Sequence, residues 1–107
     1  MCIRDSSGLD LPAFSFGLWQ NFGTDRPYAT QREIVRHAFD LGITHFDNAD
    51  RYGPPHRAAQ QFFGEVLRTD LAPYRDELIL STKAGNPIGT SPYQRGGSRK
   101  ALSLIHI

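Results

Sequence analysis

The stretch "ITHFDNADRYGPP", from Ile43 to Pro55, sets the class of fold that the sequence predicts. It begins with apolar and β-branched residues, as a strand does, and places Asp47 where that strand should end. Tyr52 follows in a turn, and apolar residues at helical spacing then predict a helix over residues 57–68. A strand ending in a carboxylate, a turn holding a phenol and a helix directly after them indicate a βα unit with polar side chains at its loop end.

The sequence before this stretch predicts another βα unit. "LPAFSFGLW" (Leu11–Trp19) alternates apolar residues with small ones and predicts a short strand closed by Gly17. Thr30 is expected to open a helix, because Thr30–Glu33 fits a capping box, in which the hydroxyl and the Glu carboxylate each bind a free backbone N–H. Apolar residues recur at helical spacing up to Gly42, which supplies the C-terminal stop.

A third strand is predicted over "ELILSTKAG" (Glu77–Gly85), and Ser98 is of the type that caps a following helix. Strands that alternate with helices favour a parallel α/β sheet, which closes either as an open doubly wound sheet or as a barrel. The first turn, "GLWQNFG", does not match G-x-G-x-x-G, and the phosphate-binding pattern G-x-x-x-x-G-K-[ST] does not occur. Both observations weaken a nucleotide-binding open sheet.

Composition excludes several classes of protein. The 107 residues suffice for one small domain with a modest core. Twelve basic residues face 11 acidic ones, so electrostatics gives no reason to expect binding to nucleic acid or to an anionic membrane. No apolar run approaches the roughly 20 residues that span a bilayer. The single cysteine cannot form an intrachain disulfide.

One short DNA element explains both ends of the chain, "MCIRDS" and "LSLIHI". Back-translated as ATG TGT ATA AGA GAC AG, the first end has the reverse complement CTG TCT CTT ATA CAC AT, which encodes the second. The element resembles the transposon end used to prepare sequencing libraries. We therefore expect Met1–Ser6 and Leu102–Ile107 to be adapter sequence and residues 7–101 to carry the fold.

The second and third predicted strands bring opposite charges together. Parallel strands lie about 4.8 Å apart, and their side chains alternate between the two faces. If these strands are neighbours, the apolar residues Phe46, Leu78 and Leu80 face the helices. The opposite face then carries Ile43, His45, Asp47, Ile79, Ser81 and Lys83. Asp47 and Lys83 meet at the carboxyl edge, where each keeps the other ionised, and Tyr52 can fold back over them.

Such a trio suits proton transfer. A tyrosine in water keeps its proton up to about pH 10 and is a poor acid near neutral pH. An ammonium beside it stabilises the phenolate, as a general acid requires, and a carboxylate orients that ammonium. Tyr52 could then protonate a carbonyl oxygen while a hydride arrives on its carbon. A salt bridge beside a turn tyrosine is the alternative that spacing alone leaves open.

The residues themselves resemble the aldo-keto reductases. "GITHFDNADRYG" is similar to the family signature, with Asp, Ala and Tyr-Gly at fixed offsets, and "LILSTKAG" resembles its lysine strand. "FSFGLWQNFG", "AFDLGITHFD", "YRDELILSTKAG" and "GGSRK" together resemble the branch that contains bacterial L-glyceraldehyde 3-phosphate reductases and potassium-channel beta subunits. The resemblance covers about Ser7 to Ala101.

The resemblance implies the N-terminal part, about the first three βα units, of a (β/α)₈ TIM barrel with its site at the C-terminal face. It implies a cytoplasmic NADPH-dependent reductase of small aldehydes or ketones, without a metal. Asp47, Tyr52 and Lys83 match three members of the catalytic tetrad; the fourth, a histidine, would follow the next strand. Leu18, Trp19 and Asp47 match cofactor-binding positions. Oligomerisation of the complete protein stays open.

Two other functions compete with this one. A cofactor-binding regulatory subunit, similar to the channel beta subunits, would contain the same barrel core, so these residues do not separate it from the reductase. A short-chain dehydrogenase would need Tyr-x-x-x-Lys on one helix. Tyr52 and Lys83 are predicted on separate elements, which argues against that class.

Overall fold

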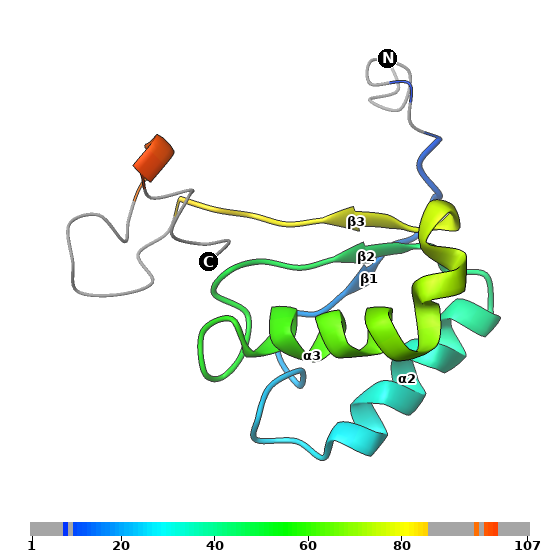
Figure 1. The fold of residues 1–107 in the computed structure, drawn as a ribbon, viewed down its shortest axis with the longest axis horizontal. Helices are drawn as coiled ribbons and strands as arrows, with labels where there is room; N and C mark the ends of the chain where they lie inside the picture. Colours follow the sequence, from blue (N-terminus) through cyan, green and yellow to red (C-terminus); the bar gives the residue numbers. More distant parts are fainter. Residues whose placement is uncertain (1–7, 9, 86–95, 97, 101–107) are drawn as a thin grey trace.

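A computed structural model describes residues 8, 10–85, 96 and 98–100 of the chain (Figure 1). Both expected adapter ends lie outside these residues, as does most of the helix expected after Ser98. The described part contains a parallel sheet and two α-helices in alternation. The elements are β1 (Phe16–Gly17), α2 (Tyr28–Asp40), β2 (His45–Asp47), α3 (Ala58–Val66) and β3 (Ile79–Ser81). A π-helical turn (Leu67–Leu71) and a 3₁₀ helix (Ala72–Glu77) join α3 to β3.

The order of the strands and the face that the helices cover describe how the sheet winds. The strands lie in the order β1-β2-β3, and each pair is parallel. Figure 1 shows α2 and α3 on the same side of the three strands, and side chains of both helices share one core cluster. A doubly wound sheet carries helices on both faces, whereas a barrel carries them all on the outside. The described elements wind as the wall of a barrel does, and one βαβαβ half of a doubly wound sheet winds in the same way.

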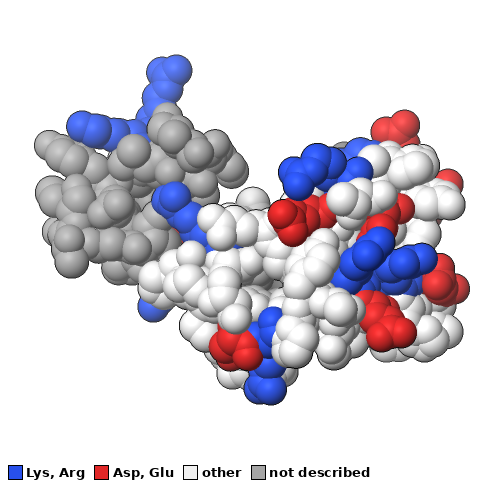
Figure 2. Space-filling view, turned by 60° about the horizontal axis from the view of Figure 1, so that its bottom comes forward, with Lys and Arg blue, Asp and Glu red and all other residues white. Residues whose placement is uncertain are grey.

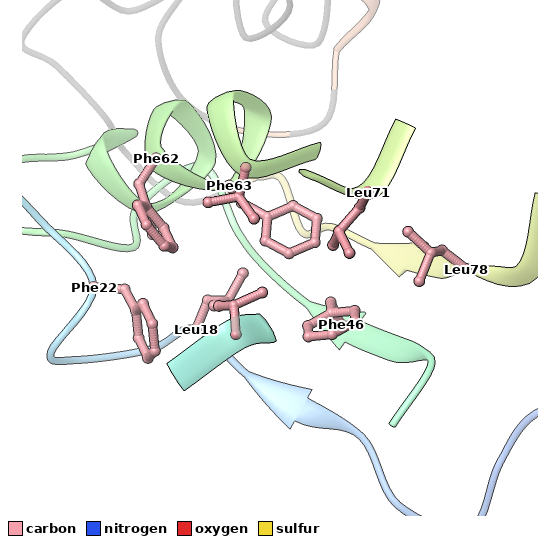
Figure 3. Close-up of a cluster of buried hydrophobic side chains, with 10 residues drawn as sticks. Leu18, Phe22, Phe46, Phe62, Phe63, Leu71 and Leu78 are labelled. Carbon is pink, nitrogen blue, oxygen red and sulfur yellow. The ribbon is translucent and has the colours of Figure 1, made fainter. Parts of the chain in front are cut away.

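The core lies between the sheet and the helices. Phe46 of β2 is 1% exposed, and its ring centroid lies 5.1 Å from that of Phe63 in α3. Figure 3 shows Phe46 and Leu78 approaching Phe63 and Leu71 from the sheet side. Leu80 packs against the same cluster. The predicted apolar face of the second and third strands is thus confirmed, and the alternation of side chains leaves the polar set on the other face.

The N-cap of helix α2 lies three residues before the expected position, and the predicted capping box is wrong. Pro27 occupies the N-cap position with no side-chain hydrogen bond, which places Thr30 inside the first turn. Its fixed φ of −59° suits the entry to a helix. Gln31 stabilises this end instead, because its buried amide nitrogen donates to the carbonyls of Gly23 and Arg26, each at 2.8 Å.

The predicted stop at Gly42 is confirmed. Gly42 has φ +96°, which glycine adopts without the steric cost of a Cβ. Its N–H donates to the carbonyl of Phe39 at 2.9 Å, and the N–H of Ile43 donates to that of Ala38 at 3.1 Å. This pair of bonds is a Schellman motif, which turns the chain directly from α2 toward β2.

The strands are shorter than predicted. Only two residues of the Leu11–Trp19 segment pair with β2, in the register Phe16↔Phe46 and Gly17↔Asp47. A strand ladder needs a partner, and within the described residues β1 has one neighbour only. Phe14, just before β1, is 78% exposed. Helix α3 begins at Ala58 because Arg57 has a left-handed φ of +72°.

Charges of both signs are interspersed on the face shown in Figure 2. The pair of Arg32 and Asp70 joins α2 to the π-helical turn through two hydrogen bonds, of 2.5 and 2.6 Å. This contact raises the pKa of Arg32 and lowers that of Asp70. The pair connects residues 38 apart in sequence and so holds α2 against the turn that follows α3.

Candidate active site

Asp47, Tyr52 and Lys83 come together at the carboxyl edge of the sheet. The Nζ of Lys83 lies 2.5 Å from Oδ2 of Asp47 and donates to the Tyr52 hydroxyl oxygen at 2.9 Å. A further bond of 3.3 Å joins Nζ to the carbonyl of Asn48. The side chain of Lys83 is 49% exposed and that of Asp47 31%, so the trio lies open to solvent at the end of the strands.

Backbone bonds beyond the strand ends hold this geometry. The N–H of Asn48 donates to the carbonyl of Ser81 at 2.8 Å, and that of Asp50 to the carbonyl of Lys83 at 3.3 Å. These bonds continue the β2–β3 pairing past its last strand residues. Tyr52 is fixed from both sides, because its N–H donates to Ala49 and its carbonyl accepts from Ala59 at the start of α3. The phenol is therefore carried by a turn anchored to both strand and helix.

The ion pair keeps its charges over a wide range of pH. Burial by itself raises the pKa of Asp47, but hydrogen bonds from Lys83 and Ser81 outweigh it, so the pKa lies below the ordinary 3.8. Burial likewise lowers the pKa of Lys83, but its bonds to Asp47 and Tyr52 hold the pKa above the ordinary 10.5. Both groups therefore stay charged between these two values.

A pocket of about 430 Å³ opens beside the trio. Its lining is Trp19, Ala49, Arg51, Tyr52, His56 and Lys83. The rings of Trp19 and Tyr52 stack, with centroids 6.4 Å apart and 29° between their planes, and the ammonium of Lys83 lies 4.9 Å from the centre of the tyrosine ring. The phenol thus faces a space bounded by an aromatic surface and by positive charge.

Leu18 and Trp19, the two residues of the first-strand turn expected to bind the cofactor, lie in different environments. Trp19 is 66% exposed and lines the pocket, whereas Leu18 is fully buried in the core cluster. The N–H of Leu18 donates to the carbonyl of Asp47 at 2.9 Å. Leu18 therefore fixes the turn from inside, and Trp19 is the side chain that it presents to the pocket.

Three residues outside the predicted site residues also lie here. Ser81 donates to Oδ1 of Asp47 at 2.7 Å, His56 lines the pocket, and Asn48 offers its carbonyl to Lys83. Ser81 carries a signal that could have found it, because it precedes Lys83 by two residues and so shares a strand face with it. The other two lie in a loop, where periodicity gives no such signal.

The described part of the chain contains neither a cluster of metal ligands nor a membrane-spanning helix. Among residues 8, 10–85, 96 and 98–100, no three His, Cys, Asp or Glu side chains gather as metal ligands would. Within the same part of the chain, no helix has the length and apolar character needed to cross a bilayer.

The amino-acid sequence matches a known protein family. The aldo/keto reductase family model matches residues 13–104, and the chain belongs to that family. It is 60% identical over 96 residues to L-glyceraldehyde 3-phosphate reductase of Escherichia coli K12, a match that covers 90% of this chain and 28% of that protein.

Two more distant relatives are named as a channel subunit and as a dehydrogenase. Identity is 33% over 98 residues to a probable voltage-gated potassium channel subunit beta of Arabidopsis thaliana, covering 90% of this chain and 28% of that protein. It is 34% over 64 residues to pyridoxine 4-dehydrogenase of Escherichia coli, covering 60% and 20%. The predicted family and branch are confirmed, and the chain spans about 28% of the length of its first relatives.

Proposed function

We propose that residues 7–101 form the N-terminal part of a (β/α)₈ barrel enzyme that reduces the carbonyl of a small aldehyde or ketone with NADPH. The observation that carries the proposal is the contact of Lys83 with both Asp47 and the hydroxyl of Tyr52 at the carboxyl edge of the sheet. Active sites of this fold lie at that edge. The terminal hexapeptides remain, on this proposal, adapter sequence outside the barrel.

Tyr52 is the general acid in this scheme. Its hydroxyl oxygen accepts a hydrogen bond from Lys83, so its own single proton stays available to a group in the pocket. That proton passes to the carbonyl oxygen as a hydride reaches the carbon, which leaves an alcohol and a phenolate. The ammonium of Lys83, 2.9 Å away, stabilises the phenolate. Asp47 keeps the ammonium protonated and oriented.

The residues around the pocket suit a nicotinamide cofactor. The exposed indole of Trp19 offers a flat apolar surface beside the Tyr52 hydroxyl. The pocket has a volume of about 430 Å³, which admits a planar ring. Trp19 and Asp47 are the proposed cofactor contacts, and Leu18 holds the turn that carries Trp19. When bound, NADPH supplies the hydride. The trio then positions and protonates the acceptor carbonyl.

The preferred substrate is an aldehyde that resembles glyceraldehyde 3-phosphate. The 60% identity to an L-glyceraldehyde 3-phosphate reductase supports this choice, as does the positive charge of Arg51 and Lys83 at the pocket. A cytoplasmic location belongs to the same proposal.

A chimeric reductase tests this function. In it, the matching 96-residue segment of the Escherichia coli enzyme is replaced by that of this chain, so that the rest of the barrel is supplied. We expect the chimera to oxidise NADPH when glyceraldehyde 3-phosphate or a reactive small aldehyde is added. A chimera that unfolds cooperatively and binds NADPH, but turns over neither aldehyde, would contradict the proposal.

That negative outcome would support the second candidate, a cofactor-binding regulatory subunit. The 33% identity to a probable channel beta subunit favours this candidate. Retention of NADPH with negligible turnover is its expected signature, whereas a reductase releases oxidised cofactor at every cycle.

A further inference from the structure

We infer that Ser81 is a positioning residue of the site, which holds Asp47 through a hydrogen-bond chain that begins at His45. The inference rests on the proposed reductase function and adds to it two residues outside the trio. Ser81 and His45 both lie on the pleat face that carries Asp47, on β3 and β2 respectively. Each is half-buried, between the core and the open mouth.

Counting protons fixes the direction of the chain. The hydroxyl of Ser81 lies 2.7 Å from Oδ1 of Asp47 and 3.0 Å from Nε2 of His45. The ionised carboxylate of Asp47 can only accept, so the single hydroxyl proton of Ser81 goes to Asp47. The bond with His45 must then be supplied by the imidazole. His45 therefore carries a hydrogen on Nε2 and donates it to the oxygen of Ser81.

The chain fixes the orientation of the carboxylate. Oδ1 of Asp47 binds Ser81, and Oδ2 binds Lys83. With only Oδ2 held, the carboxylate could rotate about its last side-chain bond, whose torsional preference is broad. The ammonium would follow this rotation and leave the hydroxyl of Tyr52, which lies 2.9 Å from it. Ser81 thus prevents a motion that would separate the general acid from the charge that supports it.

Electrostatics is consistent with this role. The bond from Ser81 and the nearby His45 both contribute to lowering the pKa of Asp47. The ionisable groups that face the Asp47 carboxylate are Lys83, from the end of β3, and His45, from its own strand; Tyr52 contacts it through Lys83. Burial raises the pKa of Asp47, and the bond from Ser81 is one of the contacts that counteract this rise. Without the Ser81 hydroxyl, protonation of Asp47 would therefore begin at a higher pH.

The test compares Ser81→Ala with two matched variants in the chimeric reductase. Ser81→Thr keeps the hydroxyl and should retain most of the turnover. Thr82→Ala removes a hydroxyl from the next residue, which binds Gln60 at 2.7 Å outside the trio. Ser81→Ala should lower kcat roughly tenfold, as expected for a lost hydrogen bond to a charged group. The acid limb of the pH profile should move toward neutral pH, whereas in Thr82→Ala it should stay in place.

A second measurement needs neither turnover nor cofactor. The ¹H–¹⁵N spectrum of the His45 ring in the cofactor-free chimera should show the hydrogen on Nε2, and Ser81→Ala should change this signal. Hydrogen on Nδ1 alone, or an unmoved pH profile in an active Ser81→Ala enzyme, would overturn the inference. If the unmutated chimera is folded but inactive, the reductase proposal fails, while the ring spectrum still decides the hydrogen-bond chain.

Discussion

Substitution of Tyr52 by Phe isolates the proton that the proposed mechanism transfers. The change removes one hydroxyl and keeps the ring, so the stack on Trp19 and the ammonium over the ring face can persist. Lys83 loses the 2.9 Å contact but keeps its bonds to Asp47 and to the carbonyl of Asn48. The ion pair and the pocket should therefore survive the substitution nearly intact.

The expected effect is large on chemistry and small on binding. A positioned general acid contributes about 10²–10⁴-fold to a rate, so kcat for carbonyl reduction should fall by at least about 100-fold. Affinity for NADPH should change by less than about twofold, because a hydroxyl directed at the substrate carbonyl is not one of the groups proposed to hold the cofactor. The loss should therefore appear in kcat far more than in cofactor binding.

The assay pairs steady-state reduction of a reactive aldehyde with fluorescence titration of NADPH, both on the chimeric reductase. Thr82→Ala serves as the control for removal of a hydroxyl near the site. Near-normal turnover in Tyr52→Phe would refute the assignment, because the phenol would then be only a turn residue. A parallel loss of cofactor affinity would instead show that the hydroxyl helps to hold NADPH.

Three further predictions concern charge, backbone and folding. Asp47→Asn and Lys83→Met should each reduce turnover and change the shape of the pH profile of kcat/KM, because each removes a charge from the site. The pKa of Asp47 is lowered and that of Lys83 is raised, so the ion pair contributes its full stability between pH 3.8 and 10.5. This contribution is lost as pH falls through the folded pKa of Asp47 or rises through that of Lys83. Urea unfolding of wild type and Lys83→Met across pH measures the contribution. Gly42→Ala should destabilise the chimera by about 1 kcal/mol because φ is +96° there. Gly64→Ala should stabilise it by about 0.5–1 kcal/mol, because Gly64 lies on the exposed face of α3 with open space around the added Cβ. Equal urea midpoints for the two variants would contradict the backbone argument. The isolated chain should show no sharp thermal transition by circular dichroism, since within the described residues both edges of the sheet lack a partner strand. A cooperative melt of the purified monomer would disprove this.

Sequence reasoning succeeded where one physical effect dominates. The alternation around Phe46 could be predicted because one strand face must be apolar to meet the helices. The stop at Gly42 could be predicted because few residues other than glycine accept its φ. The meeting of Asp47 with Lys83 followed from parallel pairing of adjacent strands, which brings residues 36 apart in sequence to one edge.

Prediction from the sequence failed where several local contacts compete. Thr30–Glu33 has the pattern of a capping box, but Pro27 starts the helix earlier and Gln31 binds the loop in front of it. The extents of the strands depend on neighbouring strands, which the residues of Leu11–Trp19 do not encode by themselves. The bond from Ser81 to Asp47 depends on side-chain rotamers, for which periodicity gives only the shared face.

The closeness in sequence of Asp47, Tyr52 and Lys83 has a consequence for recombination among relatives. These residues, with His45 and Ser81, lie within one strand-helix-strand unit, and their contacts are internal to it. Gene crossovers placed on both sides of residues 45–83 would transfer these five residues as one block, with their contacts already in register. Crossovers inside α3 would instead join a tyrosine from one parent to a lysine from another. Shuffled libraries of these enzymes should therefore retain activity most often when both breakpoints avoid this window.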